Sequence, residues 1–151
     1  MALSRQKLPA LARPEGFDPQ VMLRGGYILA DAVAAPPSVI LIATGSEVSL
    51  ALEAKKLLEA EGDRVRVVSM PCLEQFQRQD QAYREQVLPI GTPRVAIEAG
   101  VTTPWRALVG ERGLVIGLDE FGASAPDTDL AEHFGFTPDV VARKVRSMRR
   151  G

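Results

Sequence analysis

The sequence is poor in the residues that build disulfides and metal clusters. Cys72 is the only cysteine in 151 residues, and His133 is the only histidine. Neither an intramolecular disulfide nor a metal site of several cysteines can form, so a reducing compartment suits the chain and we expect the cytoplasm. The longest apolar run, residues 39–43, is far shorter than the ~20 residues of a membrane helix, and residues 1–9 lack the apolar centre of a signal peptide.

The sequence also lacks an excess of charge of either sign. It has 18 Lys and Arg against 19 Asp and Glu, a net charge of -1. A nearly neutral chain does not attract a polyphosphate backbone or an anionic membrane, which argues against nucleic acids and membranes as partners. With 46% hydrophobic and 25% charged residues, the composition is that of one ordinary globular domain and excludes a disordered tail or a coiled coil.

The spacing of apolar residues changes repeatedly between the period of a strand and that of a helix. Residues 38–44 are apolar on both faces, as in a buried central strand, and Val48, Ala51, Ala54 and Leu58 follow at helical spacing. The same reading predicts strands at 27–29, 64–69, 94–98 and 114–118. It predicts helices at 46–61, 71–76, 79–88, 105–109, 127–134 and 139–150.

Strands that alternate with helices favour a mostly parallel sheet covered on both faces. The strand at 27–29 has no helix before the next strand, so it could lie antiparallel at an edge of that sheet. Residues 1–19 contain Pro9, Pro14 and Pro19 and no sustained period, which indicates an extended arm or linker that belongs poorly to the core.

A turn between the strand at 38–44 and the following helix is the clearest candidate for binding an anion. Small side chains, open backbone amides and the helix dipole come together there. A tight strand-to-helix turn needs the same residues simply to cap the helix. The residues of this turn are Thr44, Gly45, Ser46 and Glu47.

Acidic residues follow the ends of two other predicted strands. In a parallel sheet, Glu98, Asp119 and Glu120 would share the carboxyl edge with the turn at 44–47, where ligands of open α/β folds usually bind. They could pair for acid–base chemistry or hold a metal ion. The alternative is that they hydrogen-bond loop amides or face water.

Other chemically active residues have simpler interpretations. We expect His133, beside Phe134, to pack or to cap a helix, and Cys72 to be a small core residue. Ser124 is not in a Gly-x-Ser-x-Gly motif and is no candidate nucleophile. The basic end, residues 143–150, should complement a helix C-terminus and stay solvated.

Several segments in sequence order resemble the C-terminal part of transketolase, a thiamine-diphosphate enzyme of the pentose phosphate pathway. They cover nearly the whole chain: 2–9 (ALSRQKLP), 25–29 (GGYIL), 41–48 (LIATGSEV), 66–71 (RVVSMP), 96–100 (AIEAG), 121–126 (FGASAP) and 134–137 (FGFT).

The resemblance implies a three-layer α/β/α domain with a five-stranded, mostly parallel sheet and one antiparallel edge strand. Residues 1–21 would be an arm from the preceding pyrimidine-binding domain and 22–151 the C-terminal domain. Arg5 would contact the phosphate of a sugar-phosphate substrate, a role suited to a guanidinium fork.

By the same resemblance, thiamine diphosphate, Mg²⁺ and the catalytic residues belong to upstream domains. The chain alone would then be an inactive part of a homodimer, with a structural or dimerisation role and no cofactor of its own. It is compatible with an excised domain, a truncated product or half of a split enzyme.

Two other functions fit parts of this pattern. One is a free-standing anion or nucleotide sensor that uses the carboxyl-edge loops. The other is the equivalent domain of a related thiamine enzyme, such as deoxyxylulose phosphate synthase or a 2-oxo acid dehydrogenase. The segments at 2–9 and 25–29 favour transketolase over these.

Overall fold

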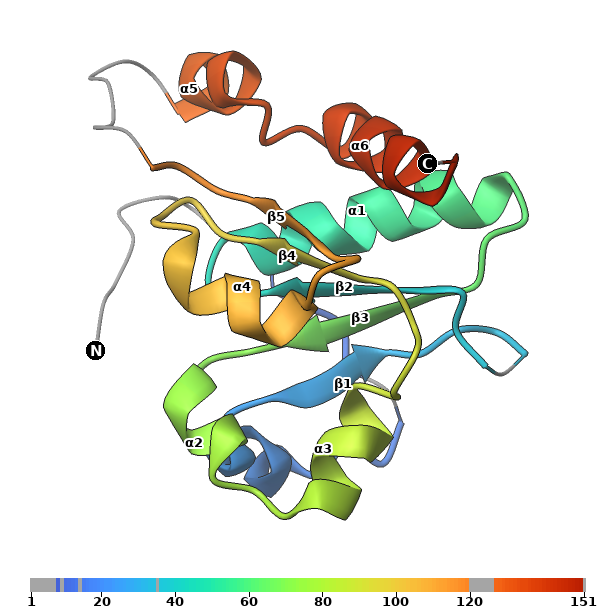
Figure 1. The fold of residues 1–151 in the computed structure, drawn as a ribbon, viewed down its shortest axis with the longest axis vertical. Coiled ribbons are helices and arrows are strands. Elements are labelled where there is room, and N and C mark those ends of the chain that lie inside the picture. Colours follow the sequence, from blue (N-terminus) through green and yellow to red (C-terminus); the bar gives the residue numbers. More distant parts are fainter. Residues whose placement is uncertain (1–7, 9, 14, 35, 120–126, 151) are drawn as a thin grey trace.

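The computed structural model describes residues 8, 10–13, 15–34, 36–119 and 127–150, and it places one five-stranded sheet between two layers of helices (Figure 1). The strand order is β1-β3-β2-β4-β5. β1 pairs antiparallel with β3 at one edge, and the other pairs are parallel. The expected α/β/α fold with one antiparallel edge strand is therefore confirmed.

The elements follow the predicted ranges closely. The strands are β1 (Tyr27–Ala30), β2 (Val39–Ala43), β3 (Val65–Ser69), β4 (Arg94–Ile97) and β5 (Leu114–Ile116). The helices are α1 (Glu47–Ala60), α2 (Leu73–Gln77), α3 (Gln81–Val87), α4 (Thr103–Val109), α5 (Asp127–Phe134) and α6 (Pro138–Arg150).

A further 3-10 helix, η1 (Pro19–Arg24), was not predicted, because its residues show no apolar period. A side-chain cap and a proline at its first position stabilise this helix. Asp18 caps its first turn by accepting a hydrogen bond from the Gln20 amide, and Pro19 supplies a fixed φ at the first position.

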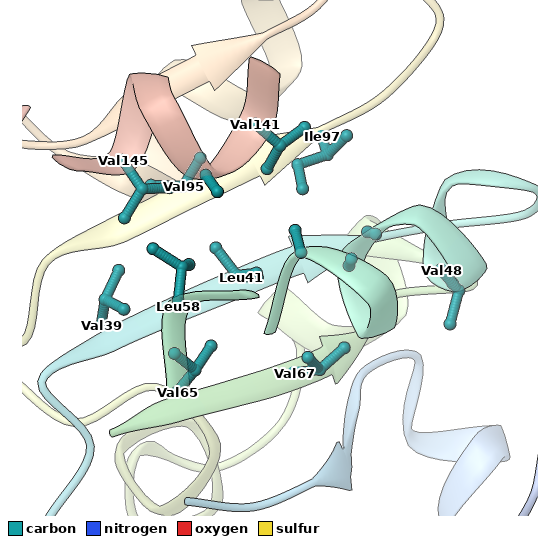
Figure 2. Close-up of a cluster of buried hydrophobic side chains, with 14 of the residues drawn as sticks. Val39, Leu41, Val48, Leu58, Val65, Val67, Val95, Ile97, Val141 and Val145 are labelled. Atoms are coloured by element: carbon teal, nitrogen blue, oxygen red, sulfur yellow. The ribbon is translucent and has the colours of Figure 1, made fainter. Parts of the chain in front are cut away.

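Two hydrophobic cores lie on opposite faces of the sheet. α1 and α6 cover one face, and α2, α3 and α4 cover the other. Figure 2 shows the first core, where the side chains of α6 meet those of β4 and α1. All five residues of β2 and of β3 are buried, because helices cover both faces of the sheet.

The segment before β1 contains a turn at residues 15–16 and the helix η1, and it is not detached from the core. Leu11 and Phe17 pack against the first core. The Phe17 and Tyr27 ring centroids lie 5.6 Å apart, and an Arg13 guanidinium nitrogen donates to the Tyr27 hydroxyl at 2.9 Å. The expectation that this arm belongs poorly to the core is therefore wrong for these residues.

A buried arginine in β3 joins three parts of the fold. The Arg66 guanidinium binds both carboxylate oxygens of Asp31, at 2.8 and 3.0 Å, and donates to the carbonyls of Gln86 and Val87 at the end of α3. Burial raises the pKa of Asp31, but the hydrogen bonds from Arg66 and the Ala32 amide, with the charges of Arg66 and Lys55, leave it below its usual value.

The basic end of the chain is held by ion pairs and is not simply solvated. Arg146 pairs with Glu61 and Arg149 with Asp63, so α6 is anchored to the turn between α1 and β3. The expectation of free basic side chains is wrong for these two residues, because their acidic partners lie 85 and 86 positions earlier in the sequence. Arg143 and Lys144 on the same helix are exposed.

Candidate functional site

The loops after β2, β4 and β5 share the carboxyl edge of the sheet, as expected from their parallel pairing. The chain leaves β2 through α1 toward β3 on one side, and leaves β4 through α4 toward β5 on the other. The topology therefore reverses between β2 and β4. In open α/β sheets, ligands bind in the crevice at this reversal.

Glu98, directly after β4, is the most perturbed acid of this edge. Burial raises its pKa to about 7, and the negative charge of Glu47 contributes to the same shift. Its Oε2 atom is buried and has no hydrogen-bond partner among the described residues. Near neutral pH this carboxyl group can therefore hold or release a proton, as general acid–base chemistry requires.

The turn at 44–47 carries Glu47, whose carboxylate is the second acid of the crevice. Gly45 has a φ of 55°, in the left-handed region that glycine adopts without strain. Ser46 precedes α1, but its hydroxyl makes no capping bond and donates instead to Glu47 Oε1 at 2.8 Å. The capping interpretation of the Ser46 hydroxyl is therefore wrong, although its position at the start of the helix is as predicted.

Asp119 is engaged by the loop before α4. The Thr102 amide and hydroxyl donate to its two carboxylate oxygens, both at 2.8 Å. These two hydrogen bonds, with a smaller effect of the Arg106 charge, hold the pKa of Asp119 below its usual value. The packing is tight, because a Cβ at Gly117 would lie 2.9 Å from the Gly100 carbonyl oxygen. Asp119 therefore fixes a loop, which was the simpler of its two interpretations.

The acid pair of this edge is thus Glu98 with Glu47, and not Glu98 with Asp119. Glu120, the third acid of the sequence hypothesis, lies outside the described residues, as do Arg5 and Ser124. The sequence already marked Glu47 as part of the turn. Its pairing with Glu98 needed the strand order, because β2 and β4 are neighbours in the sheet but not in the sequence.

The structure also shows where Cys72 and His133 lie. Cys72 is exposed at the start of α2, so its interpretation as a core residue is wrong. The apolar residues around Cys72 suggested burial. Of that stretch, Met70 and Phe76 lie in the second core and Cys72 does not. His133, in the last turn of α5, is exposed, and its ring lies edge-on to that of the neighbouring Phe134 with ring centroids 4.8 Å apart.

Metal ligands are not gathered in the part of the chain that the structure describes. No three His, Cys, Asp or Glu side chains there come together in a way that could hold a metal ion. The described helices also include none long and apolar enough to cross a membrane.

Comparisons with known proteins agree with the resemblance in the sequence. Residues 25–137 match the family described as Transketolase-like TK C-terminal domain. A plasmid-encoded transketolase of Cupriavidus necator is 51% identical over 146 residues, which cover 97% of this chain and 21% of the relative. This chain therefore spans about a fifth of the length of that curated relative.

Solved structures of transketolases also match this chain. A transketolase of Pichia stipitis, in complex with sedoheptulose-7-phosphate, matches with a TM-score of 0.84 and 37% identity, over 95% of this chain and 20% of that one. A protein described as a split gene transketolase, inactive beta4 tetramer, matches with a TM-score of 0.69 at 24% identity, over 95% of this chain and 47% of that one. At that identity, the second match shows the fold alone.

Proposed function

This chain belongs to the transketolase C-terminal domain family, and on that premise we propose that it is the third domain of an enzyme that moves a two-carbon ketol unit between sugar phosphates. The observation that carries the proposal is 51% identity over 97% of this chain to a transketolase of which it spans only 21%. Such a match is expected of a domain within a larger enzyme of the same kind.

The cofactor would lie outside this chain. Thiamine diphosphate supplies an electron sink for a carbanion when it is bound, and Mg²⁺ would hold its diphosphate. The described residues do not fit that metal, since they bring no three potential ligands together. We therefore assign no catalytic step to the carboxyl edge. By the family resemblance, both groups would be bound by upstream domains, which would be the partners of this chain.

The share of residues 22–151 in the whole enzyme would be structural, apart from the substrate contact of Arg5 in the preceding arm. The sheet with its two cores would present a surface to upstream domains and to a second subunit in a cytoplasmic homodimer. Exposed Met22 and Leu23 on η1 and exposed Val101 after β4 are apolar side chains suited to such contacts. The isolated chain would be inactive.

A chimera tests this function. Residues 1–151 would replace the matched segment of the Cupriavidus necator transketolase, and ketol transfer from xylulose phosphate to ribose phosphate would be measured with thiamine diphosphate and Mg²⁺. We expect the chimera to be active and the relative without its C-terminal segment to be inactive. A chimera that folds and binds the cofactor but transfers no ketol unit would contradict the proposal.

A substitution of Arg5 in the same chimera tests its proposed contact with the substrate phosphate. We expect Arg5→Gln to raise the KM for a phosphorylated donor about tenfold or more, because a guanidinium–phosphate contact is worth ~1.5–3 kcal/mol. The KM for a donor without a phosphate should not change, and Lys7→Gln serves as the matched control. Equal KM changes for both donors would assign Arg5 a structural role.

An anion site at the turn formed by Thr44, Gly45, Ser46 and Glu47 remains a separate proposal. The N-terminus of the 14-residue helix α1 favours it, whereas the carboxyl groups of Glu47 and Glu98 oppose it. A phosphate titration followed by amide NMR tests it. Unchanged signals at residues 44–47 would remove the proposal.

A further inference from the structure

A cleft of about 350 Å³ opens on the face of the sheet that α2, α3 and α4 cover, and we call it the α3–α4 cleft. Its lining comes from α2 and α3, from the residues that follow α3, from α4, and from Arg94 at the start of β4. The other lining residues are Phe76, Gln77, Gln81, Arg84, Glu85, Leu88, Ile90, Ala107 and Leu108. Arg94 stands at the amino end of a parallel strand. The cleft is therefore distinct from the carboxyl edge described above.

The floor of the α3–α4 cleft is formed by apolar side chains that are almost fully buried, each at most 9% exposed. Phe76, Leu88 and Leu108 line it and belong to the second core. Ile90, also in the lining, keeps 77% of its surface exposed. The hydrocarbon surface that a ligand would meet in the cleft is mainly that of Ile90, beside polar groups of the lining, so a ligand gains from carrying a small apolar or planar group of its own.

Two guanidinium groups give the cleft a positive charge. Arg94 donates to the carbonyls of Leu88 and Leu108 at 2.9 Å and of Pro89 at 3.2 Å, which fixes its head between the ends of α3 and α4. Arg84 lies on the exposed side of α3. Among the described residues, neither guanidinium forms an ion pair with a carboxylate.

The one acid in the lining, Glu85, offsets one of the two positive charges and pairs with neither guanidinium, so the cleft keeps a net positive charge. Glu85 accepts a hydrogen bond from the side-chain amide of Gln81 at 2.6 Å, within α3. Burial lowers the pKa of the Arg94 guanidinium, as expected for a cation without a counter-charge. An anion at this position would supply the missing charge and would find Arg94 already held in place.

From this combination we propose that the α3–α4 cleft binds a small organic anion, with its charged head on Arg84 and Arg94 and its apolar body against Ile90. The volume is at the lower end of the range for small-molecule sites, which fits a compact organic phosphate or carboxylate better than a dinucleotide. The proposal does not depend on transketolase activity.

The test uses the 151-residue chain and phenyl phosphate as the probe, followed by amide NMR. We expect saturable shifts at residues 76–94 and 107–108 with a dissociation constant near or below about 1 mM, as for a ligand of this size. Phenol lacks the charge and inorganic phosphate lacks the ring, so each should bind at least about tenfold more weakly. Whether benzoate or phenyl phosphate binds more tightly identifies the preferred headgroup.

Two variants keep the proposal falsifiable without disturbing the core. Arg84→Gln, at an exposed position, should weaken phenyl phosphate binding about tenfold or more, and the matched control Arg143→Gln on α6 should not. Ala107→Phe, at another exposed position, should fill the cleft and abolish binding. Equal affinities of phenol and phenyl phosphate, or of the Arg84 and Arg143 variants, would overturn the proposal.

Discussion

The fold raises the pKa of Glu98 above that of a glutamate in water. Its carboxyl group is partly buried beside that of Glu47, and one oxygen has no partner among the described residues. The folded state therefore binds the proton of Glu98 more tightly than the unfolded chain, in which a glutamate has a pKa near 4.5. The stability that this proton contributes is present below pH 4.5 and is lost as the pH rises through about 7.

We therefore predict that Glu98→Gln stabilises the protein at pH 8, by about 1 kcal/mol after allowance for solvent screening. The gain should shrink as the pH falls toward 4, where Glu98 is neutral in both states. Urea unfolding at several pH values measures it, and Glu53→Gln, on the exposed side of α1, is the control. A difference between Glu98→Gln and the parent that is the same at pH 4 and pH 8 would contradict the predicted shift.

Residue-level roles were only partly predictable from the sequence. The acids of the carboxyl edge were recognised because each follows a predicted strand. Their pairing was not, because it depends on which strands are neighbours. Cys72 was misjudged because an apolar neighbourhood in sequence does not fix the direction of one side chain. It precedes α2 in an extended conformation and points away from the core.

At the scale of elements, α3 depends on residues far from it in the sequence. Its last carbonyls accept hydrogen bonds from Arg66 of β3 and Arg94 of β4. Unpaired carbonyls at a helix C-terminus carry a partial negative charge, so a cation there satisfies both hydrogen bonding and the dipole. A strand arginine with 10% of its side chain exposed is otherwise unexpected in a sheet.

We predict that Arg66→Met lowers the free energy of unfolding by about 2 kcal/mol, because the buried carbonyl of Val87 and the partly buried carbonyl of Gln86 lose their charged donor. Asp31→Asn should cost less, since half of the Asp31 side chain is already exposed. Urea midpoints measure both, with the exposed Arg78→Met as control. If Arg66→Met unfolds at the same midpoint as Arg78→Met, the Arg66 contacts are not stabilising.

The elements themselves were well predicted, since strong periods and glycine or proline boundaries define most of them. Gly62, with a φ of 93°, ends α1 where the sequence places its end. η1 was missed because six residues are too few to show a period. The contact between the segment at 11–17 and β1 was missed because it depends on tertiary packing.

For the whole molecule, α6 closes one face of the sheet although it lies beyond the matched residues 25–137. Val141, Ala142 and Val145 are fully buried against the first core, and two ion pairs hold the helix to the turn before β3. This helix therefore supplies part of the first core although it lies outside the matched region.

We predict that Val145→Ala costs roughly 2 kcal/mol, from the lost methyl groups and the cavity that they leave. Arg143→Ala, one of the exposed positions of the same helix, should change the unfolding midpoint little. Thermal or urea unfolding measures both variants. Similar midpoints for the two would mean that α6 packs only loosely on the sheet.

The lengths of the outer strands bear on how the protein behaves at high concentration. β1 has four residues and β5 has three, so each edge of the sheet has few backbone groups with which another chain could pair. Long, flat edge strands promote aggregation through intermolecular β-pairing, and short ones discourage it. Polymerisation through strand addition should therefore be slow in this molecule, even when it is prepared apart from any partner.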